Sequence, residues 1–504
     1  MKHNIAKSAL WVTISEVFFN LSGFIIHAVL GRFLGPDDYG RYGLIVTLTT
    51  MVIILIGNGI PTAMAKYISE YFETDADMVL AIKRRSIQLQ AIIIGIVTVL
   101  FYFSIPLIAG ALGDPTLIPL FKISTLIIPA FAAASFYFSY YTGLHRFNMQ
   151  ATLKTTRSIF RIAFVVGLAL IFGVKGSITG YIIAPFSVFL IAFLIDKFKI
   201  DPELKERSTG KAVDFEWKKL TNYAWQVVAF FLAYELLISI DLYLVKGILH
   251  DDYLTGIYNG VLTVGRIPYY IFYAMTIFLL PMVSRAIGNN NHQEARDIIS
   301  KSIRIMIILL VPMIIIMSAY SMEILQLFYG HKYVVGAYPM SIFVYGVGFL
   351  TIFYVLSFAM NGAGQTKIPM WISIFGVTIN TILNYILVSR YSITGSAVAT
   401  SITSFLITVL MLYYLNRLFK VYISVLTMLR VLLAGSLVYF VSNFMLGGKY
   451  IFILWSIILF VLYILTLFAI KEIKKDDLQF LMQVVKRKKV AEVQEELSGN
   501  EPSA

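Results

Sequence analysis

Long apolar runs separated by short polar loops cover nearly the whole chain. A bilayer core needs about 20 mainly apolar residues per helix, and we count fourteen candidate runs. Helices are expected because lipid offers no partner for an unpaired backbone group. The pattern predicts an all-α integral membrane protein with about 14 transmembrane helices. The runs begin near Ile5, Tyr42, Ser86, Leu117, Ser158, Ile178, Tyr223, Gly256, Ile303, Ala337, Pro369, Ile393, Val425 and Ile451.

Two short motifs recur at nearly the same separation. Ser-Ile-Thr-Gly occurs at Ser177–Gly180 and again at Ser392–Gly395. Asp-Asp-Tyr occurs at Asp37–Tyr39 and again at Asp251–Tyr253. Matches in register at the mouths of apolar runs indicate an internal duplication. Each repeat would hold six spans, and an even number gives both repeats the same orientation, as in transporters built from parallel repeats.

The duplication predicts the domain organisation. We expect two six-helix lobes in parallel duplication, followed by two additional C-terminal helices. The longest internal polar segment should be the linker between the lobes. The expected divisions are an N-terminal lobe at 1–200, a cytoplasmic linker at 201–222, a C-terminal lobe at 223–420, two further helices at 421–470 and a basic tail at 471–504.

Composition excludes several other classes of protein. The chain is 59% hydrophobic and only 14% charged, whereas a soluble domain carries about 25% charged residues. There is no cysteine, which excludes disulfides, thiolate metal sites and cysteine nucleophiles. No phosphate-binding Gly-x-x-x-x-Gly-Lys-Ser/Thr motif occurs, so no ATP-driven motor lies in this chain. We expect no cofactor and no metal, and we interpret the N-terminus as a retained first span, not a cleaved signal peptide.

The net charge of +13 follows from membrane topology. With both termini placed in the cytoplasm, the positive-inside bias is roughly four to one. The tail Lys486–Lys489 would then lie against anionic headgroups, and no nucleic-acid partner is expected. We therefore predict a multi-pass protein of the cell membrane. The basic residues left in external loops are Arg32, Arg41, Lys122, Lys175, Lys246, Lys332, Arg390 and Lys449.

A polar stripe runs along the first predicted span. Asn20, Gly23 and His27 fall within about 40° of Glu16 on a helix of 3.6 residues per turn. A carboxylate deep in a membrane helix normally faces a cavity or a partner. Glu16 is therefore a candidate proton or cation site and Asn20 a candidate substrate contact. A hydrogen-bonded seam between helices is the alternative.

A second set of candidates lies in the second repeat. Glu235 and Asp241 are intramembrane carboxylates, and Arg266 shares a helix face with Asn259. Arg266 is the one Lys or Arg placed well inside a predicted span. It would bind a phosphate, or else pair with Asp241 or Glu235.

Four further residues join the candidate set. Arg161 at the start of the fifth span could bind an anionic headgroup or simply follow the positive-inside rule. Asn380 and Asn384 share a face and could contact sugars or hold helices together. Asp37, in the turn between Arg32 and Arg41, is a candidate gating residue that could equally neutralise those arginines.

The first external loop carries a family signature. The stretch Gly31–Tyr42 resembles the first-loop motif of polysaccharide flippases, in the superfamily shared with multidrug and toxin extrusion transporters. Phe328–Tyr333 and Ile393–Ala397 look like further pieces of the same pattern. The lipid II flippase branch is similar but usually carries arginines in its first helix, where this chain has Asn20, Ile26 and His27.

The resemblance implies a function. The substrate would be an oligosaccharide linked to a polyprenyl phosphate or pyrophosphate. The two lobes would open alternately around a central cationic cavity, with H⁺ or Na⁺ as candidate coupling ions, and the protein would work as a monomer. It implies no catalysis. The substrate-binding candidates are Arg266, Arg32, Arg161, Asn20, Asn259, Asn380 and Asn384, and the coupling or gating candidates are Glu16, Glu235, Asp241 and Asp37.

Two other functions stay open at this point. One is a multidrug or cation antiporter of the same superfamily, although such proteins usually lack the two extra spans. The other is a membrane glycosyltransferase, because Asp37-Asp38 is an acidic pair and Asp75-Ala-Asp77 is a literal Asp-x-Asp. These two acidic motifs are predicted on opposite sides of the membrane, and the short external loops leave no room for a catalytic domain.

Overall fold

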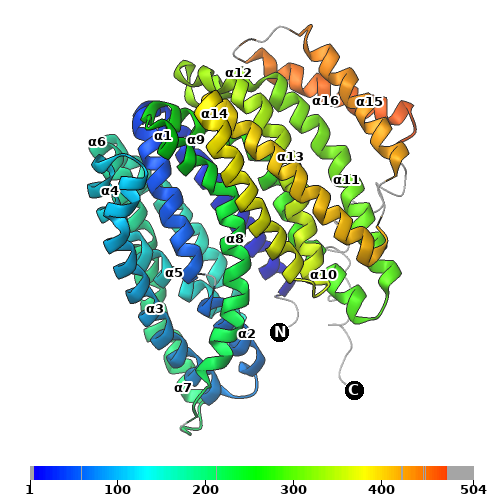
Figure 1. Cartoon of the computed structure of the whole chain (residues 1–504). Helices are drawn as coiled ribbons and strands as arrows, with labels where there is room; N and C mark the ends of the chain where they lie inside the picture. Colours follow the sequence, from blue (N-terminus) through cyan, green and yellow to red (C-terminus); the bar gives the residue numbers. More distant parts are fainter. Residues whose placement is uncertain are drawn as a thin grey trace. The chain divides into compact units, whose positions relative to one another are not determined.

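Helices make up the protein, and no strand occurs among the residues that the structure describes. The structure is a computed structural model (Figure 1). Several side chains at the start of the first helix and inside the helices Trp217–Leu249 and Ile267–Gly288 are not described, although their backbone is. The described residues are 5–57, 59–211, 213–421, 424–445, 448 and 450–473.

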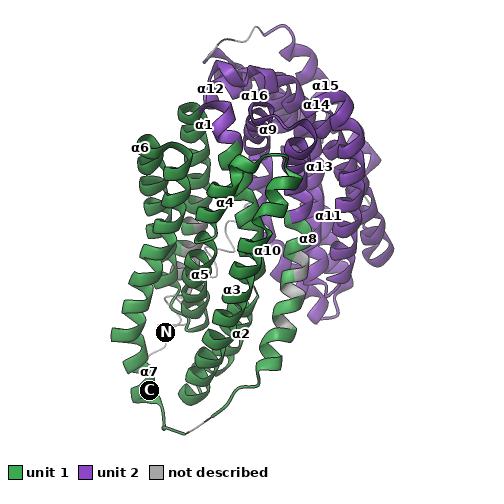
Figure 2. Ribbon diagram, turned by 60° about the vertical axis from the view of Figure 1, so that its left-hand side comes forward, with its two compact units in different colours: residues 1–34, 41–235, 486–504 green, residues 35–40, 236–485 purple. Residues whose placement is uncertain are grey.

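The chain forms two compact units (Figure 2). The first contains the residues before Gly35 together with Arg41–Glu235, and the second begins at Leu236. The second unit also includes the short segment Gly35–Gly40. This grouping does not test the predicted division into six, six and two spans, which stays a prediction.

The first unit is built from α1 to α7 and the first half of α8. Within it, α5 packs on α2 and α6, and α2 packs on α3. The helices are α1 (Ile5–Gly57), α2 (Ile60–Tyr71), α3 (Ala76–Ala111), α4 (Ile118–Ser124), α5 (Ile127–Gly143), α6 (Phe147–Ile195), α7 (Asp201–Arg207) and α8 (Trp217–Leu249).

The second unit contains the rest of α8 and the helices that follow it. Here α13 packs on α10, α11 and α14, and α11 also packs on α15. The helices are α9 (Asp252–Gly265), α10 (Ile267–Gly288), α11 (His292–Ala319), α12 (Ser321–Tyr329), α13 (Ala337–Gly362), α14 (Lys367–Phe419), α15 (Val425–Ser442) and α16 (Ile451–Ala469).

Three of the longest helices contain a break. In α1 the backbone turns at Gly35, whose φ of 76° favours glycine, and Pro36 follows. In α6 and α14 the breaks lie at Gly173 and Ser392, with φ values of 58° and 54°. These breaks fall between predicted spans one and two, five and six, and eleven and twelve. The structure is therefore consistent with fourteen spans.

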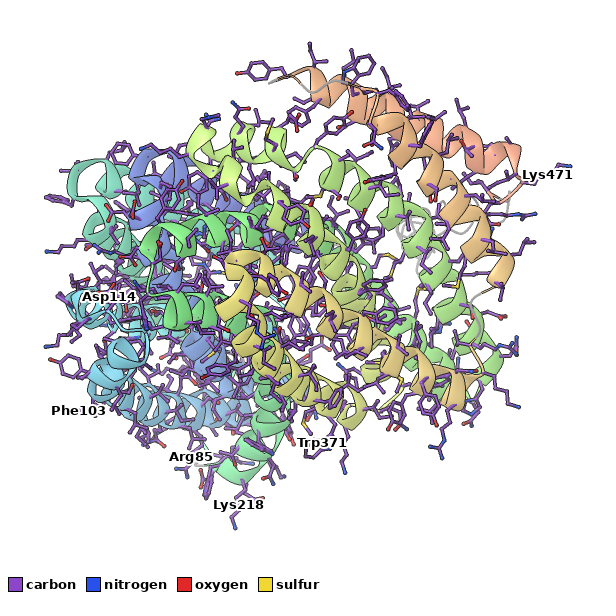
Figure 3. All side chains as sticks on the ribbon, turned by 45° about the horizontal axis from the view of Figure 1, so that its top comes forward. Arg85, Phe103, Asp114, Lys218, Trp371 and Lys471 are labelled. Atoms are coloured by element: carbon purple, nitrogen blue, oxygen red, sulfur yellow. The ribbon has the colours of Figure 1, made fainter. Side chains whose placement is uncertain are left out.

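Surface composition identifies a membrane protein. Among the described residues, nine helical stretches are long and apolar enough to cross a bilayer. Large apolar side chains point away from their own unit, such as Phe103 on α3 and Trp371 on α14 (Figure 3). Their exposed fractions are 74% and 62%. Such exposure is stable against lipid tails but not against water.

The connection between α6 and α8 is tied to the first unit by charged contacts. A turn of π-helix at Asp196–Ile200 leads into α7. Lys83 on α3 forms a buried ion pair with Asp196 at 2.7 Å and a second one with Asp201 at 2.8 Å. Asp77 accepts hydrogen bonds from Ser208, Thr209 and Gly210. The predicted linker is thus an ordered part of the first unit where it is described.

One buried carboxylate after α16 links the last two helices, α15 and α16, to α11. Glu472, just after α16, is 1% exposed and pairs with Arg304 on α11 and Arg430 on α15, both at 3.0 Å. Burial alone would raise the pKa of Glu472. The hydrogen bond from Thr427 and the two guanidinium groups outweigh burial and lower that pKa below its ordinary value.

Candidate functional site

A buried polar network surrounds Asp241 in the second unit. Asp241 is fully buried and accepts a hydrogen bond from the amide of Leu242 at 3.0 Å. Its other carboxylate oxygen contacts the hydroxyls of Tyr258 and Thr400, each at 3.3 Å. These groups come from α8, α9 and α14, so three separate segments of the unit meet at one carboxylate.

The network continues along α14. Asn384 donates to the side chain of Asn380 at 2.7 Å and accepts a hydrogen bond from Ser396 at 2.6 Å. The hydroxyl of Tyr258 also interacts with Ser396 and Thr400. All of these side chains are buried. A carboxylate surrounded by amide and hydroxyl oxygens can hold a proton or a small hard cation.

Arg266 lies at a break in the predicted eighth span. The span divides into α9 and α10, and Arg266 is the residue between them. The guanidinium donates to the backbone carbonyl of Ile238. Its Nε is buried and has no hydrogen-bond partner among the described residues. Arg266 and Asp241 form no ion pair in the part of the chain that the structure describes, although their opposite charges attract each other.

Arg161 is a second arginine within an apolar helix bundle, and it lies inside α6 in the first unit. It donates to the carbonyl of Phe19 at 2.8 Å and to the hydroxyl of Ser22 at 2.6 Å. The guanidinium lies over the ring of Phe19, 4.3 Å from its centroid. A Cβ added to Gly23 would come within 3.1 Å of this guanidinium. Arg161 therefore packs beside the predicted polar stripe of the first span, and its buried Nε also lacks a partner among the described residues.

Arg157, one turn before Arg161, sits among aromatic rings. It is 5% exposed, and its guanidinium lies 4.7 Å from the ring centroids of Phe19, Phe131 and Phe138. Such a cage stabilises a cation within an apolar helix bundle. This contact could not be predicted from the spacing of the arginines alone.

The remaining predicted residues are distributed over both units. In the first unit Arg32 and Asn20 are exposed and Glu235 is half-buried. In the second unit Asp37 is exposed, while Asn259 is buried and donates to the carbonyl of Tyr39 at 3.4 Å. Glu16 falls within α1, but its side chain lies outside the described residues.

The two copies of the Asp-Asp-Tyr motif lie against each other within the second unit. A Cβ placed on Gly40 would come within 2.6 Å of the carbonyl oxygen of Asp252, and one on Gly256 within 1.7 Å of that of Pro36. Only glycine permits this backbone contact. Tyr39 then packs on Tyr329, with ring centroids 5.5 Å apart. The predicted loop motif thus has a definite packing role.

The Asp-x-Asp sequence is occupied by structural contacts. Asp75 caps α3 by accepting a hydrogen bond from the amide of Met78 at 2.9 Å. Asp77 accepts hydrogen bonds from residues 208–210 in the segment between α7 and α8. Both carboxylates are therefore already engaged, which does not fit the metal and sugar-phosphate site that a glycosyltransferase would need.

Ser396 and Thr400 were not among the predicted site residues. They lie four residues apart, so they share one face of a helix, and Ser396 directly follows the repeated Ser-Ile-Thr-Gly motif. That spacing next to a duplicated motif is the signal that could have identified them. Tyr258 could not be found in this way, because its contact with Asp241 depends on how α8 and α9 pack.

Comparison with known proteins agrees with this architecture. Residues 5–287 match the model of the family described as polysaccharide biosynthesis protein. Residues 228–386 match a second family model, MatE. The first match covers more than half of the chain.

Relatives and solved structures add detail. A relative from Haloferax volcanii, named probable low-salt glycan biosynthesis flippase, is 25% identical over 82% of this chain and 84% of its own. The fold resembles the lipid II flippase MurJ in an inward closed conformation, with a TM-score of 0.74, 15% identity and coverage of 95% of this chain and 100% of that chain. An inward-facing multidrug resistance MATE transporter matches with a TM-score of 0.69 at 13% identity, covering 82% and 98% of the two chains. This protein therefore belongs to the polysaccharide biosynthesis protein family.

Proposed function

We propose that the protein is a flippase that moves polyprenyl-linked oligosaccharides across the cytoplasmic membrane by alternating access. The observation that carries the proposal is Arg266, a guanidinium at a helix break with a buried Nε that lacks a partner among the described residues. A buried N–H without a partner is costly, and a phosphate oxygen would satisfy it. Family membership and the names of several relatives support the same substrate class.

The substrate would contact several of the predicted residues. Arg266 and Arg161 each offer a guanidinium suited to bidentate binding of a phosphate or pyrophosphate. Exposed Arg32 would meet the substrate near the membrane surface, and exposed Asn20 would meet it about halfway along the first span. Asn259 would contribute through its side-chain amide. Asn380 and Asn384 are buried and bonded to one another, which favours a part in the Asp241 network over contact with sugar.

We propose Asp241 as the coupling site, occupied by H⁺ or Na⁺. Charge inside a membrane helix is expensive and is normally retained for function. Transport would follow when binding of the cation changes the contacts that Asp241 makes with Tyr258 and Thr400. Glu16, Glu235 and Asp37 remain secondary candidates for coupling or gating. We further propose that the protein acts as a monomer in the cell membrane, with both termini in the cytoplasm.

The second candidate function is a cation-driven multidrug antiporter. The MatE match over residues 228–386 is the observation that favours it. The two extra helices α15 and α16, which Glu472 secures to α11, favour the flippase over this alternative.

Deletion of the gene in its own host tests the proposed function. A flippase mutant should accumulate lipid-linked oligosaccharide on the cytoplasmic leaflet and lose surface glycan. Lipid extracts analysed by mass spectrometry and a surface lectin stain would show both effects. Normal glycan together with increased sensitivity to cationic drugs would instead support the antiporter.

A further inference from the structure

One face of α10 carries three tyrosines in line with Arg266. On a helix of 3.6 residues per turn, Arg266, Tyr269, Tyr270 and Tyr273 fall within about 100° of each other. Arg266 is at the start of this face, and Tyr273 lies about 10 Å further along the helix axis. Tyr270 is 44% exposed, and Tyr269 and Tyr273 are half-buried. The face therefore presents a cation followed by accessible aromatic rings.

A buried ring on the neighbouring helix holds two of these tyrosines in place. Tyr354 on α13 is 3% exposed. Its ring centroid lies 4.9 Å from that of Tyr269 in an edge-on arrangement and 6.0 Å from that of Tyr273 in a stacked one. Phe358 supports Tyr354 from the same helix at 5.0 Å. Rings fixed in this way lose little conformational entropy when a ligand stacks on them.

The residues 216 positions earlier, in the first predicted repeat, include no tyrosine. Gly40 and Gly256 are 216 residues apart, and so are the helix caps Asp75 and Asn291. The same separation thus occurs at both ends of the intervening segment, although the helix break lies after Gly57 in the first repeat and at Arg266 in the second. At that separation the first repeat has Thr50, Ile53, Ile54 and Gly57 in place of Arg266 and the three tyrosines. These four residues lie at the end of α1, which is helical there without a cation or an aromatic ring at these positions.

We propose that Tyr269, Tyr270 and Tyr273 form a stacking platform for the first sugars of the substrate, next to the phosphate held by Arg266. The proposal rests on the proposed flippase function and adds the residues that recognise the glycan. The C–H face of a sugar ring carries partial positive charge and stacks on the negative face of an aromatic ring. Tyrosine also offers a hydroxyl that can hydrogen-bond to sugar hydroxyls. The distance along α10 from Arg266 to Tyr273 suits a disaccharide beside a bound phosphate.

The test compares two lipids that differ only in the sugar. The full-length protein in nanodiscs is titrated with polyprenyl pyrophosphate and with the same lipid carrying a tetrasaccharide of neutral hexoses. We expect the wild type to bind the glycosylated lipid more tightly. The double variant Tyr269→Leu/Tyr273→Leu should lose about 3- to 10-fold in affinity per ring for that lipid and keep the affinity for the sugar-free lipid. The matched variant Tyr269→Phe/Tyr273→Phe keeps both rings and should retain most of the gain.

The possible outcomes distinguish failure of the stacking platform from failure of the proposed flippase function. An unchanged preference for the glycosylated lipid in the leucine variant overturns the platform. Equal affinity of the wild type for the two lipids also overturns it, while leaving the phosphate site in place. Failure of the wild type to bind either lipid overturns the proposed function, and the platform with it. If the leucine variant does not bind the sugar-free lipid, the single change Tyr269→Ile, which introduces the residue of the first repeat, provides the same comparison.

Discussion

Two sets of buried ion pairs join distant parts of the sequence. Lys83 pairs with Asp196 in the first unit, and Glu472 pairs with Arg304 and Arg430 in the second. Asp241 differs, since its described hydrogen bonds come from neutral groups. A buried carboxylate without a bound cationic side chain is well suited to exchange a proton or a cation.

Asp241→Asn should separate coupling from folding. The amide keeps the size of the side chain and an oxygen that can accept from the Leu242 amide, but it removes the charge. We expect normal expression, transport slowed by roughly tenfold or more, equivalent to about 1.4 kcal/mol, and little dependence on pH or sodium. Flux measured under imposed proton and sodium gradients checks this.

The control for this variant is Asp75→Asn. Asparagine caps a helix about as well as aspartate, so transport and its cation dependence should stay at wild-type values. An Asp241→Asn protein that transports normally and keeps its cation dependence would remove Asp241 from the coupling site.

The lowered pKa of Glu472 predicts how the stability of the folded protein depends on pH. Because its pKa is lowered in the folded protein, its contribution is complete above the unfolded pKa of 4.5 and is lost as the pH falls through the folded value. Glu472→Gln should therefore reduce stability by about 1–3 kcal/mol at neutral pH. The difference from wild type should shrink in acid. Thermal unfolding between about pH 7 and pH 3 measures both effects.

The exposed residue Glu206 on α7 gives the matched control. Glu206→Gln should leave stability unchanged at every pH, because an exposed carboxylate contributes little. A gap between Glu472→Gln and wild type that stays constant down to pH 3 would contradict the assignment.

At the scale of elements, the fold depends on where helices break and where backbones touch. The break at Gly35 and the contact between Gly40 and Gly256 place the segment Gly35–Gly40 in the second unit. Repeated motifs in the sequence predicted a duplication, and the structure adds that the two motif copies contact each other. The contact could not be predicted, because it joins residues more than two hundred positions apart.

Gly256→Ala should release this contact. The added methyl group would come within 1.7 Å of the carbonyl oxygen of Pro36, so the segment Gly35–Gly40 must move away. We expect faster amide hydrogen exchange in that segment and a loss of roughly 2 kcal/mol or more in stability. Gly95→Ala is the control, because nothing lies within 4 Å of its added Cβ and alanine favours a helix. Unchanged exchange in Gly256→Ala would contradict the packing described here.

The apolar pattern predicted the helices, and the structure explains which side chains meet inside them. The predicted carboxylate Asp241 and amides Asn380 and Asn384 belong to one network, which the spacing of polar residues alone did not reveal. Arg266 was predicted inside a span and lies at a break between helices, because α9 ends at Gly265 and Pro268 suits the first turn of α10. Helix packing determines the polar network, and no local sequence pattern records it, whereas Pro268 is a local signal for the break at Arg266.

At the scale of the whole molecule, the two predicted repeats differ in the chemistry of their side chains. The second repeat carries Asp241 and the tyrosine face of α10, whereas the first has apolar or small residues at the positions of that face. Substrate recognition and coupling are thus proposed to involve the two repeats unequally.

Orientation in the membrane can be tested by labelling, since the chain has no cysteine of its own. The positive-inside bias predicts that a cysteine at Thr209 is protected from impermeant reagents in intact cells. A cysteine at Gly448 should react. Mass shifts after labelling intact and opened cells provide the measurement, and the reverse pattern would overturn the proposed topology.

The most direct test of the central claim is transport by the purified protein in liposomes. Polyprenyl pyrophosphate carrying a fluorescent oligosaccharide is placed in one leaflet, and its appearance in the other is followed over time. The wild type should move the lipid. Arg266→Ala should slow movement by about tenfold or more, because charge-assisted hydrogen bonds contribute roughly 1.5–3 kcal/mol each. Arg266→Lys should retain part of the activity.

Arg285→Ala removes an exposed arginine near the end of the same helix and should behave as wild type. The account predicts this order: wild type and Arg285→Ala fastest, Arg266→Lys intermediate and Arg266→Ala slowest. Wild-type liposomes that move the lipid no faster than protein-free liposomes, while exchanging cationic dyes for protons or sodium, would contradict it.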